Sequence, residues 1–408
     1  MNRIWSAGSF LLPGENIDLK KYAVIACDQY TSEKEKWEAA DAFVSGAPST
    51  LRMILPECWL NETETRVPQI QRAMKDYLAR GVITEKVRNG FVLTERVTPS
   101  GARWGLVITV DLEAYDYSRS SSSPIRPTEG TIVERIPPRL NVRRGAPIEL
   151  SHVMMLLDDP EDTVIGRARD IRGSLPLLYD TDLMMLGGHL RGWAVEGEAL
   201  KKTGEALDRL LESKRPGDIF FAVGDGNHSL ATAKAYWEEL KKSLPKEALT
   251  NHPARWASVE LVNIYCPALT FEPIHRVVFH TAADRVLDCL AAASPVPCGE
   301  GPDIVLMTGD GDKPLRFEKP LHPLPVGTVQ AALDQRGGFE IDYVHGEDAV
   351  RALSSRPGTV GILVPPIPKD GFFDAVRPGP LPRKTFSMGE ANEKRFYMEA
   401  RLITGEKA

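Results

Sequence analysis

Apolar and polar positions follow each other along this chain in patterns that predict its local structure. Residues 218–224 form a nearly unbroken apolar run, which predicts an interior strand. Directly afterwards, apolar residues recur at helical spacing from 230 to 240 and predict a helix with one buried face. Residues 90–97 and 103–113 alternate apolar and polar side chains on either side of a glycine-containing turn, which predicts a β-hairpin.

Further patterns predict elements in the first half of the chain. Helical spacing and end signals predict helices over 32–44 and 68–81. Apolar runs bounded by turn residues predict strands over 22–30 and 49–57. The segment 182–197 is centred on two glycines and predicts a second hairpin.

Strands and helices alternate, but hairpins are too frequent for a purely parallel sheet, so the predicted fold class is α+β with mixed sheets. We expect an N-terminal α/β domain (1–120), a central domain (121–300) and a C-terminal α/β unit (301–408). The last unit closes with a basic loop and a terminal helix. The serine-rich stretch 117–127 is a linker or a mobile loop, and the sequence leaves both open.

Composition limits the partners and the compartment. The chain has 408 residues and a net charge of −6, which argues against a general nucleic-acid-binding surface. No run approaches the roughly 20 apolar residues of a membrane span, and the first residues lack the basic leader of a signal peptide. We therefore expect a cytoplasmic protein with a small-molecule substrate; its oligomeric state is left open, a homodimer among the options. The scattered cysteines form no Cys-x-x-Cys pair and favour reduced thiols: Cys27, Cys58, Cys266, Cys289 and Cys298.

The turn between the predicted strand and helix has an unusual composition. Two glycines, an acid, an amide and an imidazole occupy consecutive positions: Gly224, Asp225, Gly226, Asn227 and His228. Free backbone N–H groups and the helix dipole attract anions at a helix start, and glycines let a ligand approach closely. Asp225 could hold a divalent cation, and His228 could contact a phosphate or move a proton. The turn therefore predicts a phosphate site.

A plainer interpretation of this turn stays open on the residues alone. Asp225 or Asn227 would cap the helix, with His228 an ordinary first-turn residue. The spacing does not match a Walker loop, and the dinucleotide fingerprint Gly-x-Gly-x-x-Gly is incomplete. The scattered histidines form no His-x-x-x-His pair, which argues against a zinc centre.

Five blocks in order resemble bacterial domain-of-unknown-function family 1015. They are IRPTEGTIVERIPPRL, APIELSHVMMLLDDP, VGDGNHSLATAKAYWE, FEPIHRVVF and LPRKTFSMGEANEKRFYMEARLI, and the resemblance spans about Tyr22 to Ile403. The family name implies no activity. The resemblance does imply a link to serine metabolism, because family members are often encoded beside serine-biosynthesis enzymes.

The Asp-Gly-x-His turn before a helix is also similar to the signature of the ParB/sulfiredoxin-like fold, which includes partition proteins, sulfiredoxins and free-serine kinases. The similarity implies a core of that fold with additional α/β units. It also implies an upstream glutamate base and a turn that holds phosphate and metal. Asp225, Gly226 and His228 match the turn, and Glu129 is the candidate base. Ser229 stands where the pattern has an arginine, so another cation must replace it.

Side chains in the other blocks complete the predicted site. An acid next to an arginine, a threonine and a glycine suits a base beside a phosphate, although Glu129 could equally be a solvated loop carboxylate. The basic loop near the C-terminus could close over a phosphorylated ligand or be an ordinary surface loop. His152 and His189 are expected to be structural. The predicted phosphate or substrate contacts are Arg126, Thr128, Arg135, Gly224, Gly226, Asn227, Ser229, Arg276, Arg383 and Lys384.

Together these features predict a phosphotransferase that acts on a small hydroxylated metabolite, with free L-serine as the leading acceptor. Glu129 would accept the hydroxyl proton, Asp225 would bind Mg²⁺, and His228 with the turn would hold the phosphate of a nucleotide or pyrophosphate donor. Dephosphorylation of phosphoserine would use the same site in reverse. The alternative is a non-catalytic regulator of ParB-like fold that binds a nucleotide or a phosphorylated metabolite. The acidic pI disfavours DNA partition, and the absence of cysteine from the turn disfavours sulfiredoxin chemistry.

Overall fold

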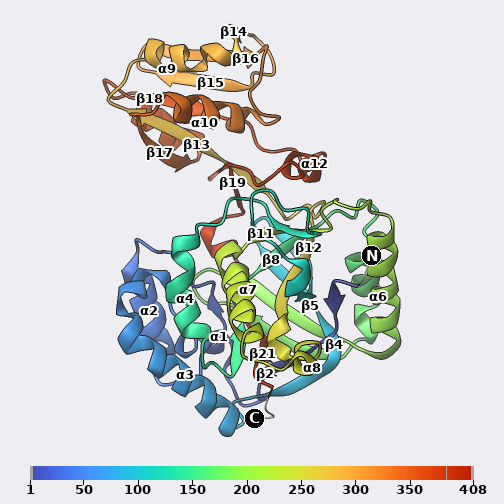
Figure 1. Ribbon diagram of the computed structural model, residues 1–408. Coiled ribbons are helices and arrows are strands. Elements are labelled where there is room, and N and C mark those ends of the chain that lie inside the picture. The colour runs from blue at the N-terminus through green and yellow to red at the C-terminus, as the bar shows by residue number, and fades with distance from the viewer. Residues whose placement is uncertain (1–2, 383, 406–408) are drawn as a thin grey trace. The chain divides into compact units, whose positions relative to one another are not determined.

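The computed structural model describes residues 3–382 and 384–405 and divides the chain into two compact units. Unit 1 comprises Met1–Leu269 and Glu390–Ala408, and unit 2 comprises Thr270–Gly389 (Figure 1). The C-terminal segment therefore returns to the unit in which the chain begins.

Unit 1 is built around one large sheet with helices packed against it. Its strands are β1 (Trp5–Ser6), β2 (Gly8–Pro13), β3 (Val24–Ile25), β4 (Ile83–Thr98), β5 (Gly101–Asp111), β6 (Ile125–Pro127), β7 (Ile148–Leu150), β8 (Met154–Leu157), β9 (Leu177–Asp182), β10 (His189–Val195), β11 (Phe221–Asp225), β12 (Trp256–Asn263), β20 (Phe396–Tyr397) and β21 (Ala400–Leu402). Its helices are α1 (Leu19–Tyr22), α2 (Lys34–Val44), α3 (Thr63–Ala79), α4 (Ile136–Arg143), α5 (Ile165–Asp170), α6 (Gly197–Glu212), α7 (Asn227–Lys241) and α8 (Lys246–Leu249). The 12-stranded sheet has the order β6-β11-β8-β12-β5-β4-β2-β21-β7, with β1, β9 and β10 joined to it.

Both faces of this sheet are buried. Along β4, Val92 belongs to one core cluster and its neighbours Phe91 and Leu93 belong to the other, because side chains alternate across a strand. Trp37 of α2 anchors the first cluster and Trp237 of α7 the second. In Figure 1, α4 lies beside α7, and the two helices pack together. The hairpin predicted over 90–113 is confirmed as β4–β5. Of the hairpin predicted over 182–197, the second strand is confirmed as β10, but its partner β9 lies almost entirely before the predicted segment.

Unit 2 is a smaller α/β unit with its own seven-stranded sheet. Its elements are β13 (Phe271–Phe279), α9 (Ala283–Leu290), β14 (Pro295–Pro297), β15 (Ile304–Thr308), β16 (Gly311–Phe317), α10 (Pro325–Arg336), β17 (Glu340–His345), α11 (Glu347–Ser354), β18 (Val360–Leu363), α12 (Phe372–Val376) and β19 (Phe386–Met388). The strand order is β14-β16-β15-β18-β13-β17, and β19 pairs with β13. Mixed sheets and helices in both units confirm the predicted α+β class.

The unit boundaries differ from the three predicted segments. The predicted break after residue 120 lies inside unit 1, because β12 pairs with β5 from Trp256↔Asp111 to Val262↔Gly105. The predicted break after residue 300 lies inside unit 2, because β13 pairs with β17 and β18. Hydrogen bonding between strands distant in sequence decides both boundaries.

Local predictions in the first half of the chain hold in part. The two predicted helices are confirmed as α2 and α3, but only Val24–Ile25 of the strand predicted over 22–30 is extended. The strand predicted over 49–57 is wrong: none of these residues forms a strand, and Thr50–Arg52 forms a 3₁₀ helix. The Ser49 hydroxyl accepts from the backbone N–H of this helix at 3.3 Å, a local bond that competes with strand pairing.

The terminal helix predicted at the end of the chain is wrong. After a short 3₁₀ helix at Ala391–Glu393, the segment forms β20, which pairs with β3, and β21, which lies between β2 and β7. Residues 393–401 are buried without a break, whereas a surface helix would expose one side. Strand pairing satisfies the backbone of such a buried segment.

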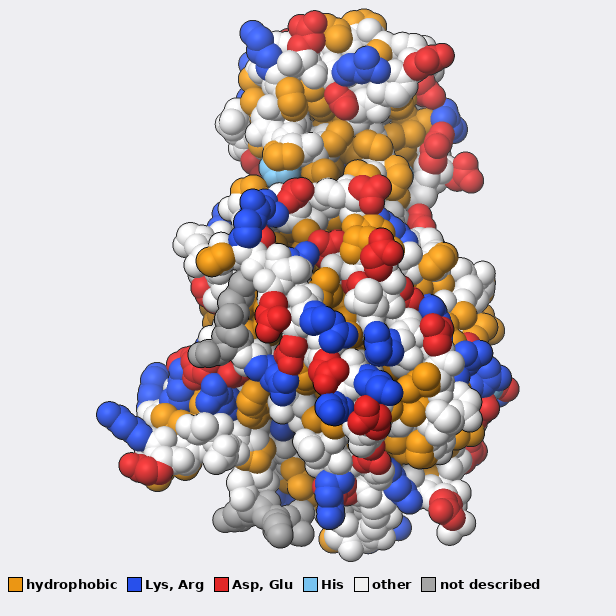
Figure 2. Space-filling model, turned by 90° about the vertical axis from the view of Figure 1, so that its right-hand side faces the viewer, with side chains coloured by type: hydrophobic (Ala, Val, Ile, Leu, Met, Phe, Trp, Pro, Cys, Tyr) orange, Lys and Arg blue, Asp and Glu red, His pale blue; other side chains and the backbone are white. Residues whose placement is uncertain are grey.

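Three global predictions concern the surface and the thiols. Among the described residues, no helix is both long and apolar enough to cross a bilayer. The five cysteines, all within the described ranges, carry free thiols, as predicted. Acidic and basic side chains are interspersed on the face of the molecule shown in Figure 2.

Candidate functional site

The predicted turn lies where β11 gives way to α7. β11 is buried between β6, its parallel neighbour, and β8, its antiparallel neighbour. The register with β8 shifts between Val223 and Asp225, so Gly224 is an extra residue in the strand. A bulge of this kind redirects the side chain that follows it, which here is Asp225.

Gly226 is required by both its backbone angles and its surroundings. It precedes α7 with φ 75° and ψ 25°, a left-handed conformation that suits glycine. A Cβ there would lie 2.9 Å from the Cα of Val153 and 3.3 Å from the Cδ2 of His152. Within the described chain no side chain caps α7, so the interpretation of Asp225 or Asn227 as a helix cap is wrong.

The Asp225 carboxylate is incompletely hydrogen-bonded. Its Oδ1 accepts from the backbone N–H of Gly226 at 3.0 Å. Its Oδ2 is buried and has no hydrogen-bond partner among the described residues, although the Lys394 ammonium lies 3.5 Å away. The side-chain oxygen of Asn227 is likewise buried and has no hydrogen-bond partner among the described residues. Buried oxygens normally accept hydrogen bonds, so a cation or the hydrogen-bond donors of a ligand would satisfy these two oxygens.

His228 holds a loop against the start of α7. Its Nε2 accepts from the backbone N–H of Ile132 at 3.2 Å. Burial, together with the positive charges of Arg139 and Arg135, lowers the pKa of His228 from 6.5 to about 4. The imidazole is therefore neutral near pH 7, and a phosphate would be contacted through its Nδ1–H.

The loop that carries Glu129 begins at the same sheet edge as the turn. β6 and β11 are parallel and paired, so both strands end there. The backbone N–H and the hydroxyl of Thr128 both donate to the carbonyl of Val223, at 3.1 and 2.8 Å. Arg126 is buried and donates to two backbone carbonyls at 2.8 Å each. Thr128 and Arg126 thus hold the backbone that positions Glu129.

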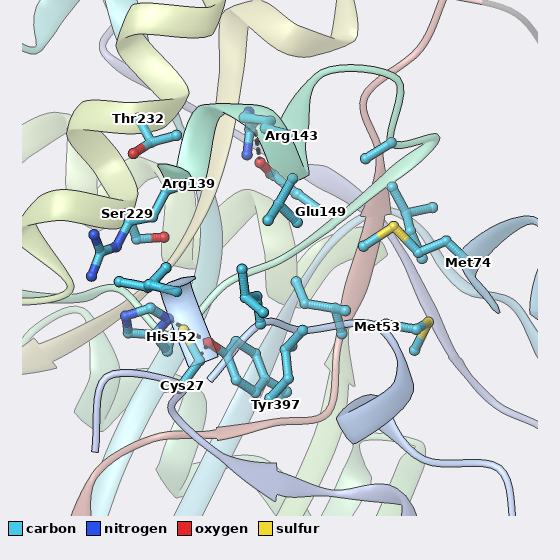
Figure 3. Close-up of a pocket in the computed structure, with 17 residues that line it drawn as sticks. Cys27, Met53, Met74, Arg139, Arg143, Glu149, His152, Ser229, Thr232 and Tyr397 are labelled. Carbon is cyan, nitrogen blue, oxygen red and sulfur yellow. Dashed lines mark hydrogen bonds and ion pairs between the residues drawn. The ribbon is translucent and has the colours of Figure 1, made fainter. Parts of the chain in front are cut away.

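A cavity of about 110 Å³ lies beside the start of α7 (Figure 3). Ser229 and Thr232 reach it from the first turns of that helix. In Figure 3, His152 and Tyr397 point toward one another with Cys27 beside them. Most of the remaining wall is apolar and includes Met53, Leu55, Leu60, Met74 and Ile148.

The charged side chains of the cavity wall are paired. Glu149 accepts from Arg143 at 2.5 Å and from Arg401 at 2.9 Å. Burial alone would raise the pKa of Glu149, but the charges of Arg401 and Arg143 outweigh it and lower that pKa. Arg139 forms an ion pair with Glu57. These pairs fix the shape of the wall.

The Asp225 carboxylate at the turn would hold Mg²⁺ together with the phosphate of a bound ligand. Within the described ranges, no three His, Cys, Asp or Glu side chains gather as a metal-binding group. Mg²⁺ is commonly held by one or two carboxylates together with water and substrate phosphates, and the unmatched Oδ2 of Asp225 suits that arrangement.

Arg276 and Lys384, both predicted phosphate contacts, belong to unit 2, whereas this site is built from unit 1. Arg276 is fully buried and donates to the carbonyl of Lys384 at 3.0 Å and to that of Ile274. It also donates to the Gln330 side chain at 3.3 Å, so its contacts support the fold of unit 2. Arg383 lies outside the described residues.

Sequence patterns missed four residues that the fold brings to the turn and the cavity. Lys394 and Tyr397 lie on the closing segment, for which the pattern predicts a helix. Asp28 follows β3, and His152, expected to be structural, precedes β8. Polar residues at the ends of buried strands were the available signal.

The sequence matches the family model described as protein of unknown function (DUF1015) over residues 11–336. The chain belongs to the DUF1015 family. The closing block that carried part of the resemblance, residues 381–403, lies beyond the matched range. No curated protein matched this DUF1015 chain.

Solved structures show a distant likeness to the DUF1015 chain. A free serine kinase variant in complex with AMP is 9% identical over 73% of this chain and 92% of its own, with a TM-score of 0.37. SbnI with a C-terminal truncation, from Staphylococcus aureus, is 10% identical over 74% and 84%, also at 0.37. A conserved hypothetical protein from Pyrococcus furiosus is 9% identical over 73% and 95%, at 0.34. Scores this low carry no argument for an activity, so the case rests on the site itself.

Proposed function

We propose that this protein transfers a phosphoryl group to or from the hydroxyl of a small metabolite, with free L-serine as the first acceptor to test. The observation that carries the proposal is the buried Asp225 Oδ2, which lacks a hydrogen bond among the described residues and faces Lys394 at the start of the 15-residue helix α7. Phosphoryl transfer depends mainly on positioning and charge stabilisation, which a helix N-terminus, a lysine and a carboxylate-bound cation supply.

Positive charge gathers at the start of α7 although Ser229 stands where an arginine was expected. Arg139 and Arg135 both lower the pKa of His228, so their charges reach the turn. In this proposal Lys394 contacts the phosphate in place of the missing arginine, and Asp225 binds Mg²⁺. The transfer also needs a general base for the acceptor hydroxyl, for which the sequence names Glu129 as a candidate.

The cavity adjoins the turn through Ser229 and Thr232, which line it from the first turns of α7. An acceptor bound in the cavity would therefore lie beside a phosphate held at the turn. The donor is a nucleotide or pyrophosphate, and the screen below distinguishes them.

The test is a phosphate-transfer screen on purified protein with Mg²⁺. L-Serine and other hydroxylated metabolites are offered with ATP, ADP or pyrophosphate, phosphoserine is offered in reverse, and mass spectrometry identifies the products. Asp225→Asn and Lys394→Met should abolish turnover. Asp76→Asn, which removes an acid from an exposed helical ion pair, is the matched control and should keep it.

The outcomes separate the proposal from its alternative. Product that disappears in Asp225→Asn but not in Asp76→Asn supports the enzyme. Binding of a nucleotide or phosphorylated metabolite without turnover of any pair would replace the enzyme by a ligand-binding regulator. Absence of both binding and turnover would sink the phosphate site as well.

A further inference from the structure

A chain of hydrogen-bonding groups runs from the cavity into the protein. The backbone N–H of Cys27 lies 3.2 Å from the Tyr397 hydroxyl, which lies 2.7 Å from Nδ1 of His152 (Figure 3). Nε2 of His152 lies 3.4 Å from Oδ2 of Asp28. Tyr397 and His152 both line the cavity, so the chain begins where a ligand would sit.

The partners decide which way each proton points. The N–H of Cys27 can only donate, so the Tyr397 oxygen accepts from it. Asp28 lies 3.4 Å from Nε2 of His152, so a neutral imidazole that carries its proton on Nε2 leaves Nδ1 to accept the hydroxyl proton of Tyr397. Asp28 is itself held by the side-chain amide of Gln29 at 2.9 Å.

Asp28 is ionised in this arrangement. Burial would raise the pKa of its carboxyl, but the interactions with His152 and Gln29 and the charge of Lys394 outweigh burial and lower it. An ionised carboxylate on the far side of an imidazole stabilises the imidazolium that forms when Nδ1 accepts a proton. His152 is therefore equipped to receive the proton that Tyr397 passes on.

The hydrogen-bonded series from Tyr397 through His152 to Asp28 also adjoins the turn. His152 Cδ2 lies 3.3 Å from the position that a Cβ on Gly226 would occupy. Lys394, which faces Asp225, is on the same segment as Tyr397. A hydroxyl bound at Tyr397 and a phosphate bound at the turn would therefore be neighbours.

We propose that Tyr397, His152 and Asp28 form the proton path that activates the acceptor hydroxyl, an inference that rests on the proposed phosphoryl transfer. The acceptor O–H donates to the Tyr397 oxygen. As the acceptor oxygen bonds to the phosphorus of the donor and the bond to the leaving group breaks, the acceptor proton moves to Tyr397. The proton of Tyr397 moves to Nδ1 of His152, the leaving group keeps the electron pair, and the imidazolium releases its proton to solvent after the products leave.

This path differs from the base predicted by sequence. Tyr397 and His152 line the cavity next to Ser229 and Thr232, whereas Glu129, itself a described residue, is not among the lining residues. Tyr397 is then the catalytic residue that touches the acceptor, and Asp28 is a positioning residue that acts through His152.

The test compares kcat and KM of Tyr397→Phe with those of the wild type in the productive donor–acceptor pair. We expect kcat to fall about 100-fold while KM stays within about threefold. Tyr77→Phe is the matched control, because Tyr77 is another buried tyrosine whose hydroxyl accepts from a backbone N–H, that of Ser49 at 2.9 Å. It should leave kcat unchanged.

A second pair of variants covers a failure of Tyr397→Phe to fold. Asp28→Asn should lower kcat, and Asp28→Glu should restore part of it, which a purely structural role would not require. Nitrogen-15 NMR of His152 in the wild-type protein should show the Nε2–H tautomer. The Nδ1–H tautomer would overturn the path.

The outcomes also separate this inference from the proposed function. Wild-type protein that turns over no pair removes the function and the path with it. Wild-type turnover that survives in Tyr397→Phe but not in Glu129→Gln keeps the function, overturns the path and returns the proton to Glu129.

Discussion

Neighbouring side chains of the closing segment, residues 393–401, reach two different buried sites. The two sites differ in how completely their buried carboxylates are hydrogen-bonded. Arg395 and Glu399 lie in a network of charged groups around a void of about 10 Å³. Lys394 and Tyr397 instead reach the turn and the cavity of about 110 Å³.

In the network around Arg395, every oxygen of the two carboxylates has a partner. Glu260 accepts from the Thr94 hydroxyl at 2.8 Å and pairs with Arg395 at 3.3 Å. Glu399 pairs with Arg395 at 2.7 Å and accepts from the Tyr179 hydroxyl. A void this small holds about one water, so the network leaves no room for a ligand.

At the turn, by contrast, the Asp225 carboxylate is incompletely hydrogen-bonded, and the neighbouring cavity is larger than the void in the Arg395 network. Oδ2 of Asp225 has only the ammonium of Lys394 at 3.5 Å to balance it among the described groups. A buried carboxylate whose oxygens all have partners anchors the fold, whereas a buried carboxylate oxygen without a hydrogen bond is available to a ligand. The following predictions test this difference.

Arg395→Met should have the largest effect on stability. It leaves two buried carboxylates without their cation and should lower the free energy of unfolding by about 3–5 kcal/mol, measured by urea denaturation. Arg209→Met is the control, because it removes one partner of an exposed ion pair whose atoms lie 4.0 Å apart. It should change the free energy of unfolding by less than about 0.5 kcal/mol. Equal losses would contradict the anchoring role of the network.

Gly226→Ala should lower the free energy of unfolding by about 2–3 kcal/mol, because the left-handed backbone and the crowding against Val153 both oppose a Cβ. Gly217→Ala is the matched control: it also has a positive φ, of 87°, but nothing within 4 Å of its added Cβ. It should cost only about 1 kcal/mol. If chemical denaturation finds the two losses equal, crowding at the turn is unimportant.

His228 should make stability fall with acid over a limited range. Its pKa is about 4 in the folded protein and near 6.5 when unfolded, so between these values the unfolded chain binds a proton that the folded one does not. The free energy of unfolding should drop by about 1–2 kcal/mol over that range once solvent screening of the partly exposed ring is allowed for. Unfolding measured at both ends of the range should show this drop reduced in His228→Gln, but unchanged in His280→Gln, which alters an exposed histidine.

Asp225→Asn should have the smallest effect on stability and a large effect on binding. Its carboxylate lacks one hydrogen bond, and Asp28 lies within electrostatic reach of Lys394, so the free energy of unfolding should change by less than about 1 kcal/mol. Calorimetry should show loss of phosphate-ligand binding in the same variant. A loss of stability as large as that of Arg395→Met would make Asp225 part of the anchor instead.

Local patterns predicted the elements whose partners are close in sequence. The β4–β5 hairpin follows from alternation around one turn, and β11 with α7 follows from an apolar run joined to a helical repeat. The unusual composition of residues 224–228, from which a phosphate site is predicted, is likewise readable from the sequence, because all five positions are consecutive.

Elements whose partners are distant could not be predicted in this way. The closing segment has a helix-compatible composition, but its backbone bonds to β2, β3 and β7 and it is buried on all sides. The unit boundaries were misplaced for the same reason, since β12 joins β5 across the predicted break.

The sequence by itself thus determined the strand, the turn and the helix that form one wall of the candidate site, because the hydrogen bonds and apolar spacing of those elements are local. Only the tertiary structure brought Asp28, His152, Lys394 and Tyr397 to that turn. These residues come from three distant parts of the chain, and long-range strand pairing, which no local pattern records, is what places them together.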